Sequence, residues 1–416
     1  MNQPNIDIES IRKQFPILHQ QVNGKPLIYV DNAATTQKPQ SVIDALVNYY
    51  STDNANIHRA AHTLAARSTE MFEDTRRTIQ QFINAREAEE CIFTKGVTES
   101  INLVAQTWGR KFLNAGDEVI ITTMEHHSNI VPWQMICEEK RAILKVIPIN
   151  DAGELLMDEY TKMLSPKTKL VSCVWASNAL GTINPVREII EKAHTVGAKV
   201  LLDGAQAGSH LEIDVQAMNC DFLAISSHKL YGPTGVGVLY GKREVLEKMP
   251  PYQGGGEMIK EVSFTNTTYN EIPYKFEAGT PNIGDVIAFK YALDFVNTVG
   301  KQNIANHESE LLSYFVKGLL ELNNSITNNP ITLVGTANQK VSVQSFTING
   351  IHHFDAGMML DAKGIAVRTG HHCTQPLMQR FGLEGTIRVS FSVYNTKEEV
   401  DTIVDALQSI LKFSQR

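Results

Sequence analysis

The central part of the chain alternates between short apolar runs and amphipathic stretches, and this alternation constrains the fold more than any other feature. Its strand-like runs cover residues 119–122, 145–149, 170–175, 200–202, 222–225 and 237–240. Strands that alternate with helices are typical of βαβ units built around a largely parallel sheet. We therefore predict an α/β fold with a mostly parallel sheet flanked by helices.

The regions on either side of this centre contain further predicted helices and strands, and the region that follows it predicts a second, smaller unit. Ahead of the centre, the pattern predicts a helix over 8–15 that Pro16 ends, a strand over 27–31, helices over 41–50 and 68–83, and a strand over 90–94. After it, the pattern predicts strands over 342–348, 365–368 and 387–391 and helices over 354–363 and 397–411. We therefore expect a large domain over 20–295, and a small α+β domain formed by 1–19 and 296–416.

One long segment, residues 250–282, has few periodic apolar residues and includes three consecutive glycines at 254–256. We predict that it is irregular. Long irregular segments inside a compact chain are more often functional than idle.

Composition excludes several classes of protein. With 416 residues, 43% of them hydrophobic, and a formal net charge of −7, the chain lacks the basic surface of a nucleic-acid-binding protein. It has no apolar run near the roughly 18 residues of a membrane span, and residues 1–10 lack the apolar core of a signal peptide. Its five scattered cysteines form no CxxC pair, which argues against a disulfide scaffold or structural zinc. We expect a cytoplasmic protein.

Polar residues follow two of the predicted strands at their carboxyl ends. Asp203 follows the run 200–202, and Lys229 follows 222–225 after Ser226, Ser227 and His228. In an open α/β sheet, ligands bind at this edge. An amine that can form a Schiff base and a carboxylate that can keep a pyridine nitrogen protonated are the groups that pyridoxal phosphate requires. A surface lysine and a turn aspartate are the ordinary alternative for such a pair.

A second feature could bind the phosphate of that cofactor. The sequence Gly96-Val-Thr98-Glu lies where a predicted strand turns into a helix, and helix N-termini favour anions. Ser226 and His228 could add donors. The alternative is an ordinary helix start in which the Thr98 hydroxyl is the N-cap.

Two histidine pairs occur in predicted loops. His126 and His127 follow the run 119–122, and His371 and His372 precede Cys373. An imidazole at this sheet edge could stack on a cofactor ring or move protons. The alternatives are a metal ligand, a helix cap and a solvated turn. For a metal site built from His126, His372 and Cys373, no HxH or HxxxH spacing is present.

Cys373 is the candidate nucleophile. It follows Arg368-Thr-Gly370-His-His, so cationic and imidazole groups that favour a thiolate lie beside it. Gly370 gives this loop freedom to move. The other cysteines, at 91, 137, 173 and 220, lie in apolar or helical surroundings typical of inert core residues.

Arg388 lies in a predicted strand near the end of the chain. A guanidinium can bind a carboxylate through two parallel hydrogen bonds, as an amino-acid substrate would require. A surface salt bridge is the ordinary alternative for one arginine on a strand.

Taken together, these residues resemble the group II (SufS-like) branch of the pyridoxal-phosphate-dependent cysteine desulfurases, in the class V aminotransferase-like superfamily of fold-type I. The similarity extends over essentially the whole chain. Its segments are Tyr29-Val-Asp-Asn-Ala-Ala, His58-Arg-Ala-Ala-His62-Thr-Leu, Met124-Glu-His-His-Ser-Asn-Ile-Val-Pro-Trp, Ser177-Asn178-Ala-Leu-Gly, Asp203-Gly-Ala-Gln206, Ser226-Ser-His-Lys229-Leu-Tyr-Gly-Pro-Thr-Gly, Phe276-Glu-Ala-Gly-Thr280-Pro and Arg368-Thr-Gly-His-His-Cys373. The chain departs from the family pattern at Val97, where threonine is common, and at Ser227, where glycine is usual.

The resemblance implies a role for each candidate residue. Lys229 would carry the cofactor and move the substrate proton, and Cys373 would take the sulfur as a persulfide. The expected cofactor ligands are Asp203 on the pyridine nitrogen, Gln206 on the phenolic oxygen, His126 on the ring, Thr98, Ser226 and His228 on the phosphate, and Thr280 from a second subunit. The expected substrate ligands are Asn178, Arg368 and Arg388.

The resemblance also implies the partners and leaves alternatives open. The substrate would be L-cysteine, the product L-alanine, and the protein a homodimer that passes sulfur to an acceptor protein of iron–sulfur cluster assembly. L-selenocysteine is an alternative substrate, since the sequence does not rank selenium against sulfur. A kynureninase-like hydrolase, which would not need Cys373, and an inactive scaffold that binds the acceptor are further alternatives.

Overall fold

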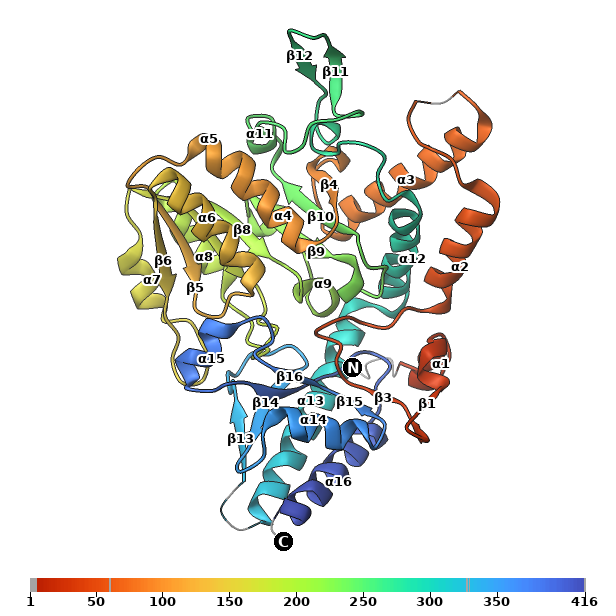
Figure 1. Cartoon of the computed structure of the whole chain (residues 1–416), viewed down its shortest axis with the longest axis vertical. Helices are drawn as coiled ribbons and strands as arrows, with labels where there is room; N and C mark the ends of the chain where they lie inside the picture. The colour runs from red at the N-terminus through yellow and green to blue at the C-terminus, as the bar shows by residue number, and fades with distance from the viewer. Residues whose placement is uncertain (1–5, 60, 327, 329, 415–416) are drawn as a thin grey trace.

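A seven-stranded sheet forms the centre of the molecule (Figure 1). The computed structural model describes residues 6–59, 61–326, 328 and 330–414. The strand order is β4 (Cys91–Thr94), β10 (Gly237–Gly241), β9 (Phe222–Ser226), β8 (Lys199–Asp203), β7 (Thr168–Val174), β5 (Glu118–Thr122) and β6 (Ile143–Ile147). All neighbours from β9 to β6 are parallel, and β10 runs antiparallel to both β4 and β9. The predicted α/β fold with a mostly parallel sheet is confirmed.

Helices cover both faces of this sheet because its strands are apolar on both sides. In β5, Val119 and Ile121 belong to one buried cluster and Ile120 to another, as the alternation of a strand requires. The helices that surround the sheet are α2 (Gln40–Asn48), α3 (Thr63–Phe82), α4 (Val97–Val104), α5 (Arg110–Phe112), α6 (Val131–Lys140), α7 (Met157–Met163), α8 (Val186–Thr195), α9 (Ala207–His210), α10 (Val215–Met218), α11 (Arg243–Leu246) and α12 (Ile283–Val299).

A second, antiparallel sheet lies below the first in Figure 1. Its order is β13 (Ile331–Val334), β14 (Val343–Ile348), β17 (Thr386–Ser390) and β16 (Arg368–Gly370), accompanied by α13 (Lys301–Asn324), α14 (His353–Asp361), α15 (Gln375–Phe381) and α16 (Lys397–Ser414). Phe315, Phe346 and Phe391 form the centre of its separate core. The domain limits proposed from the sequence stay a prediction, and their residues 1–5 and 415–416 lie outside the described part.

The N-terminal segment contacts this second sheet. Strand β3 (Ile28–Tyr29) pairs in parallel with β15 (Ile365–Ala366), and Asp31 forms an isolated bridge with Ser390. This pairing carries the residues after Tyr29 to the boundary between the two sheets. Within the described residues, no helix is long and apolar enough to cross a membrane.

Several predicted boundaries were wrong for local reasons. The predicted helix over 8–15 is only α1 (Ile8–Arg12), because Pro16 favours an extended Phe15, whose φ and ψ are −110° and 90°. The predicted strand over 145–149 is β6, which ends before Pro148 because proline cannot donate to the sheet.

The segment 250–282, predicted as irregular, contains a β-hairpin that projects from the top of Figure 1. Its strands are β11 (Ile259–Val262) and β12 (Thr267–Tyr269). Their β-branched and aromatic residues favour strands, although the segment lacks apolar periodicity.

Candidate active site

A cavity of about 220 Å³ lies where the parallel strands of the large sheet end. Asp203 ends β8 and Ser226 ends β9, while His126 follows β5 and Asn178 follows β7. Its lining residues are Ala33, Ala34, Val97, Thr98, His126, Ser128, Val174, Ala176, Asn178, Asp203, Ala205, Gln206, Ser226, His228, Lys229, Arg368, His372, Cys373 and Arg388. Every predicted site residue except Thr280 is among them.

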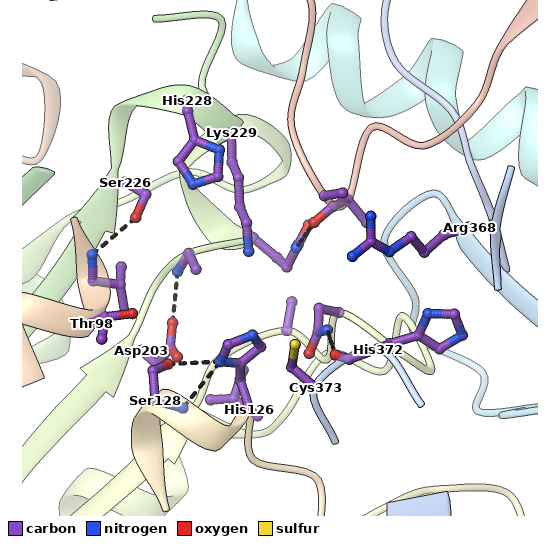
Figure 2. A pocket seen from close by; sticks show the side chains of 18 of the residues that line it. Thr98, His126, Ser128, Asp203, Ser226, His228, Lys229, Arg368, His372 and Cys373 are labelled. Atoms are coloured by element: carbon purple, nitrogen blue, oxygen red, sulfur yellow. Dashed lines mark hydrogen bonds between the residues drawn. The ribbon is translucent and has the colours of Figure 1, made fainter. Parts of the chain in front are cut away.

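Lys229 points into the middle of this cavity from the turn that follows β9 (Figure 2). Burial lowers the pKa of Lys229, and the charge of Asp203 only partly opposes this effect. Burial likewise raises the pKa of Asp203, whose Oδ1 accepts a hydrogen bond from the Ala205 amide at 2.9 Å. A cationic nitrogen placed beside Asp203 would favour its ionised form. The amine of Lys229, with its lowered pKa, and the buried carboxyl group of Asp203, whose ionised form a cation would stabilise, therefore face the same cavity.

His126 is held as a neutral imidazole with a defined tautomer. Its Nδ1 accepts a hydrogen bond from the Ser128 amide at 3.1 Å, so the ring proton lies on Nε2. Burial, together with Lys229, lowers the pKa of His126 to about 4. A flat, uncharged ring of this kind can stack on an aromatic cofactor.

The N-terminus of α4 and Ser226 form one end of the cavity, opposite Arg368 and Cys373 (Figure 2). The N-cap of α4 is Gly96, so the alternative in which Thr98 is the N-cap was wrong. Gly96 has a φ of 149°, which L side chains rarely adopt. Ser226 Oγ accepts from the Val97 amide at 2.9 Å. Helix N–H groups and the hydroxyls of Thr98 and Ser226 together suit a phosphate.

His228 and Gln206 are fixed by contacts with the segment that follows β3. Burial lowers the pKa of His228 to about 4, so its imidazole is neutral at neutral pH. The His228 carbonyl accepts hydrogen bonds from Thr35 Oγ1 at 2.9 Å and from Lys38 Nζ at 3.0 Å. The side-chain amide of Gln206 donates to the Ala33 carbonyl at 2.8 Å. These contacts fix the cavity wall around Lys229.

Cys373 points into the cavity from a loop with unusual backbone geometry. Both His372 and Cys373 are in the left-handed region, with φ values of 52° and 58°. The loop is held by hydrogen bonds from the Asn178 amide to the His372 carbonyl and from the His127 amide to the Cys373 carbonyl, both 2.8 Å. The freedom of movement predicted from Gly370 is therefore limited by at least these contacts.

The remaining cysteines are buried core residues, as predicted. Burial raises the pKa of Cys91 and Cys220 to about 12 and that of Cys137 to about 11, and it raises the pKa of Cys173 strongly. Cys373, which is partly exposed, is the one cysteine that lines the cavity.

Arg388 lies at the Cys373 end of the cavity and is buried there, contrary to the alternative of a surface residue. Its Nη1 donates to the Asn178 carbonyl and its Nη2 to Asp31 Oδ1, both at 2.9 Å. Its Nε, together with Asn178 Oδ1 and His372 Nδ1, is buried without a hydrogen-bond partner in the described structure. Buried polar atoms normally have partners, so these lining residues indicate a polar ligand.

The donor set fits pyridoxal phosphate with an amino-acid substrate. The cavity brings an amine, a buried carboxylate, a neutral imidazole and an anion-binding helix start into one space, with an arginine at the far end. Among the described residues, no group of three or more histidine, cysteine, aspartate or glutamate side chains is placed to hold a metal ion.

Thr280 is the one predicted site residue that the fold does not bring to this cavity. It lies exposed at a separate pocket beside Lys95 and Glu99. Sequence reasoning assigned no role to Asp31, although Asp31 ends the predicted strand over 27–31 much as Asp203 ends β8. Lys38 was missed because nothing in a loop sequence signals that its amine reaches the His228 carbonyl.

Comparison with known proteins identifies the family. The aminotransferase class-V family matches residues 28–403. A probable cysteine desulfurase of Mycobacterium leprae is 52% identical over 97% of this chain, which spans 65% of that protein's length. A cysteine desulfurase of Enterobacter sp. is 49% identical over 97% of this chain and 98% of its own.

Solved structures agree with this assignment. A cysteine desulfurase from Thermococcus onnurineus superposes with a TM-score of 0.92 at 37% identity, covering 99% of this chain and all of that one. The cysteine desulfurase CsdA from Escherichia coli superposes with a TM-score of 0.87 at 36% identity, covering 98% of this chain and 99% of that one. Enzymes of this family use pyridoxal phosphate, which confirms the cofactor predicted from Lys229 and Asp203. The chain therefore belongs to the aminotransferase class-V family and, within it, to the cysteine desulfurases.

Proposed function

We propose that this protein converts L-cysteine to L-alanine and retains the sulfur on Cys373. The observation that carries the proposal is that Lys229 and Cys373 reach one cavity from different elements (Figure 2). Similarity to cysteine desulfurases over nearly the full chain supports it.

Six residues of the same chain, besides Lys229, would hold the cofactor. We assign Asp203 to the pyridine nitrogen, Gln206 to the phenolic oxygen, His126 to the ring face, and Thr98, Ser226 and His228 to the phosphate. When bound, pyridoxal phosphate supplies an electron sink for the carbon atoms of the substrate. The tautomer of His126 supports its assignment, because Nδ1 is already engaged and the neutral ring face is left for stacking.

Lys229 and the arginines at the Cys373 end of the cavity would bind the substrate and act on it. The lowered pKa of Lys229 favours the neutral amine, which can take the proton from the substrate Cα. Arg388 would bind the substrate carboxylate through Nε and the N–H groups left free by Asp31 and Asn178. Arg368, which is more exposed than Arg388, would bind the substrate at the entrance of the cavity.

The sulfur transfer then needs no added oxidant, because the substrate carbon takes the electrons that the sulfur gives up. The Cys373 thiolate attacks the substrate sulfur, so an S–S bond forms as the Cβ–S bond breaks. The electron pair of the broken bond remains on the substrate carbon, which takes up a proton and leaves as L-alanine. Arg368, His372 and Arg388 line the cavity together with Cys373.

We also propose a homodimer that passes sulfur to an acceptor protein of iron–sulfur cluster assembly. Thr280 lies exposed and away from its own chain's cavity, which supports a role in the cavity of a second subunit. All five cysteines are free, which supports a reducing, cytoplasmic location.

Replacement of Cys373 by alanine tests the proposal. Cys373→Ala should keep the visible absorbance of the bound cofactor but form L-alanine from L-cysteine at least about 100-fold more slowly, since the sulfur loses its nucleophile. Cys137→Ala, at a buried cysteine that does not line the cavity, is the matched control and should keep normal turnover. Unchanged L-alanine formation by Cys373→Ala would refute the role of Cys373.

A further inference from the structure

His127 contacts the Cys373 loop at two points, although it does not line the cavity. Its backbone amide donates to the Cys373 carbonyl at 2.8 Å. Its side-chain Nε2 accepts a hydrogen bond from the Gln375 amide at 3.0 Å. One residue therefore ties the turn after β5 to positions on both sides of Thr374.

The Gln375 amide is the first N–H of helix α15, and such groups have no partner inside their own helix. The imidazole of His127 supplies the missing acceptor from another part of the chain. Because Nε2 accepts, it can carry no proton, so the contact requires a neutral ring with its proton on Nδ1.

The loop depends on such outside contacts because its own backbone is strained. His372 and Cys373 both have positive φ values, a conformation that costs free energy for residues other than glycine. Within the loop itself, the His371 side chain gives further support, since its Nδ1 accepts a hydrogen bond from the Cys373 amide at 3.1 Å. The rings of His127 and His371 lie 5.6 Å apart between centroids.

We propose that His127 is a positioning residue that holds the Cys373 loop through its neutral imidazole and releases the loop when the imidazole takes up a proton. A proton on Nε2 would face the Gln375 N–H, so the hydrogen bond would become a repulsion between two donors. Any effect of this release on sulfur transfer rests on the proposed function of Cys373, whereas the contact between His127 and Gln375 does not.

The groups around His127 determine the pH at which its imidazole takes up a proton. His126 lies beside it, the loop presents His371 and Cys373, and on α15 Arg380 is paired with Asp151. Burial, followed by the charge of His371, lowers the pKa of His127. Both effects keep the ring neutral at neutral pH, and the loop is held there.

Hydrogen exchange of the Gln375 amide in the cofactor-loaded protein tests the proposal directly. Exchange is expressed as a protection factor, which removes the intrinsic effect of pH on exchange chemistry. Between about pH 8 and about pH 4, a range that extends well below the ordinary imidazole pKa because the pKa of His127 is lowered, the wild-type protection factor should fall about fivefold or more, as expected for the loss of one hydrogen bond. Wild-type protection that does not change over this range would overturn the proposal.

Two variants of His127 distinguish the effect of its hydrogen-bond acceptor from the effect of its ring. His127→Phe keeps a ring but no acceptor, and should show low protection of Gln375 at every pH. His127→Gln keeps an acceptor that cannot be protonated, so it should stay protected and lose the pH dependence. Equal loss of Gln375 protection in both variants, or full protection in His127→Phe, would contradict the proposal. The control is His19→Gln, at an exposed histidine, which should show the wild-type protection of Gln375.

The same measurement in a Cys373→Ala background separates this proposal from the proposed function. The contacts of His127 are with backbone atoms at positions 373 and 375, so the protection pattern should be unchanged. Loss of the pattern in that background would mean that the thiol, and not His127, holds the loop.

Discussion

Arg388 and Asp31 form an ion pair at the Cys373 end of the cavity, with Nη2 2.9 Å from Oδ1. The Arg388 side chain is 2% exposed, and its Nη1 donates to the Asn178 carbonyl. Two of the three guanidinium nitrogens are therefore held by the chain itself. The orientation of Arg388 is set before any substrate arrives, and Nε remains for a ligand.

Removal of the Asp31 charge should destabilise the protein. Asp31→Asn keeps the shape of the side chain but leaves a buried guanidinium without its counter-ion, which typically costs about 3 kcal/mol or more of unfolding free energy. We expect a lower denaturant midpoint. The control is Asp151→Asn, since Asp151 pairs with Arg380 at the surface, where such pairs contribute about 1 kcal/mol or less. Equal midpoints for the two variants would show that Arg388 does not depend on Asp31.

The stability of the protein should depend on pH through His126. Burial lowers the pKa of His126 from 6.5 to about 4, so below pH 6.5 the unfolded chain binds a proton that the folded chain does not. The contribution of this ring is complete above 6.5 and is lost as pH falls through about 4. His126→Gln, which cannot titrate, should lose less stability over this range. A slope identical to wild type in denaturant titrations would refute the prediction.

Lys229 should be required for the colour of the protein as well as for its activity. Lys229→Ala removes the amine that faces Asp203 in the cavity, so the visible absorbance of the lysine-bound cofactor should disappear. Turnover of L-cysteine should fall by at least about 100-fold, in line with the loss of a general acid–base group. The control is Lys38→Ala, which removes a nearby amine that does not line the cavity and that donates to the carbonyls of Thr36 and His228 and to Thr35 Oγ1; this variant should keep the visible absorbance. A yellow, active Lys229→Ala protein would contradict the assignment of Lys229.

The sequence predicted the large sheet and its carboxyl edge well because both depend on local patterns. Buried parallel strands are continuous apolar runs, and polar residues that end them must meet at one edge. Asp203, Ser226 and His126 are therefore found where the pattern places them.

Long-range contacts were harder to predict because they leave no local signal. The pairing of β3 with β15 joins residues more than 300 positions apart and carries Asp31 to Arg388. Likewise, the sequence shows a histidine beside His126, but only the fold brings that histidine to Gln375. The hairpin of β11 and β12 was missed because its exposed residues lack apolar alternation.

The most direct test of the central claim is mass spectrometry of the protein after incubation with L-cysteine. We predict that the peptide containing Cys373 gains the mass of one sulfur atom, that a reducing thiol removes it, and that peptides with the four buried cysteines stay unchanged. Formation of L-alanine with no added sulfur on Cys373 would contradict the account.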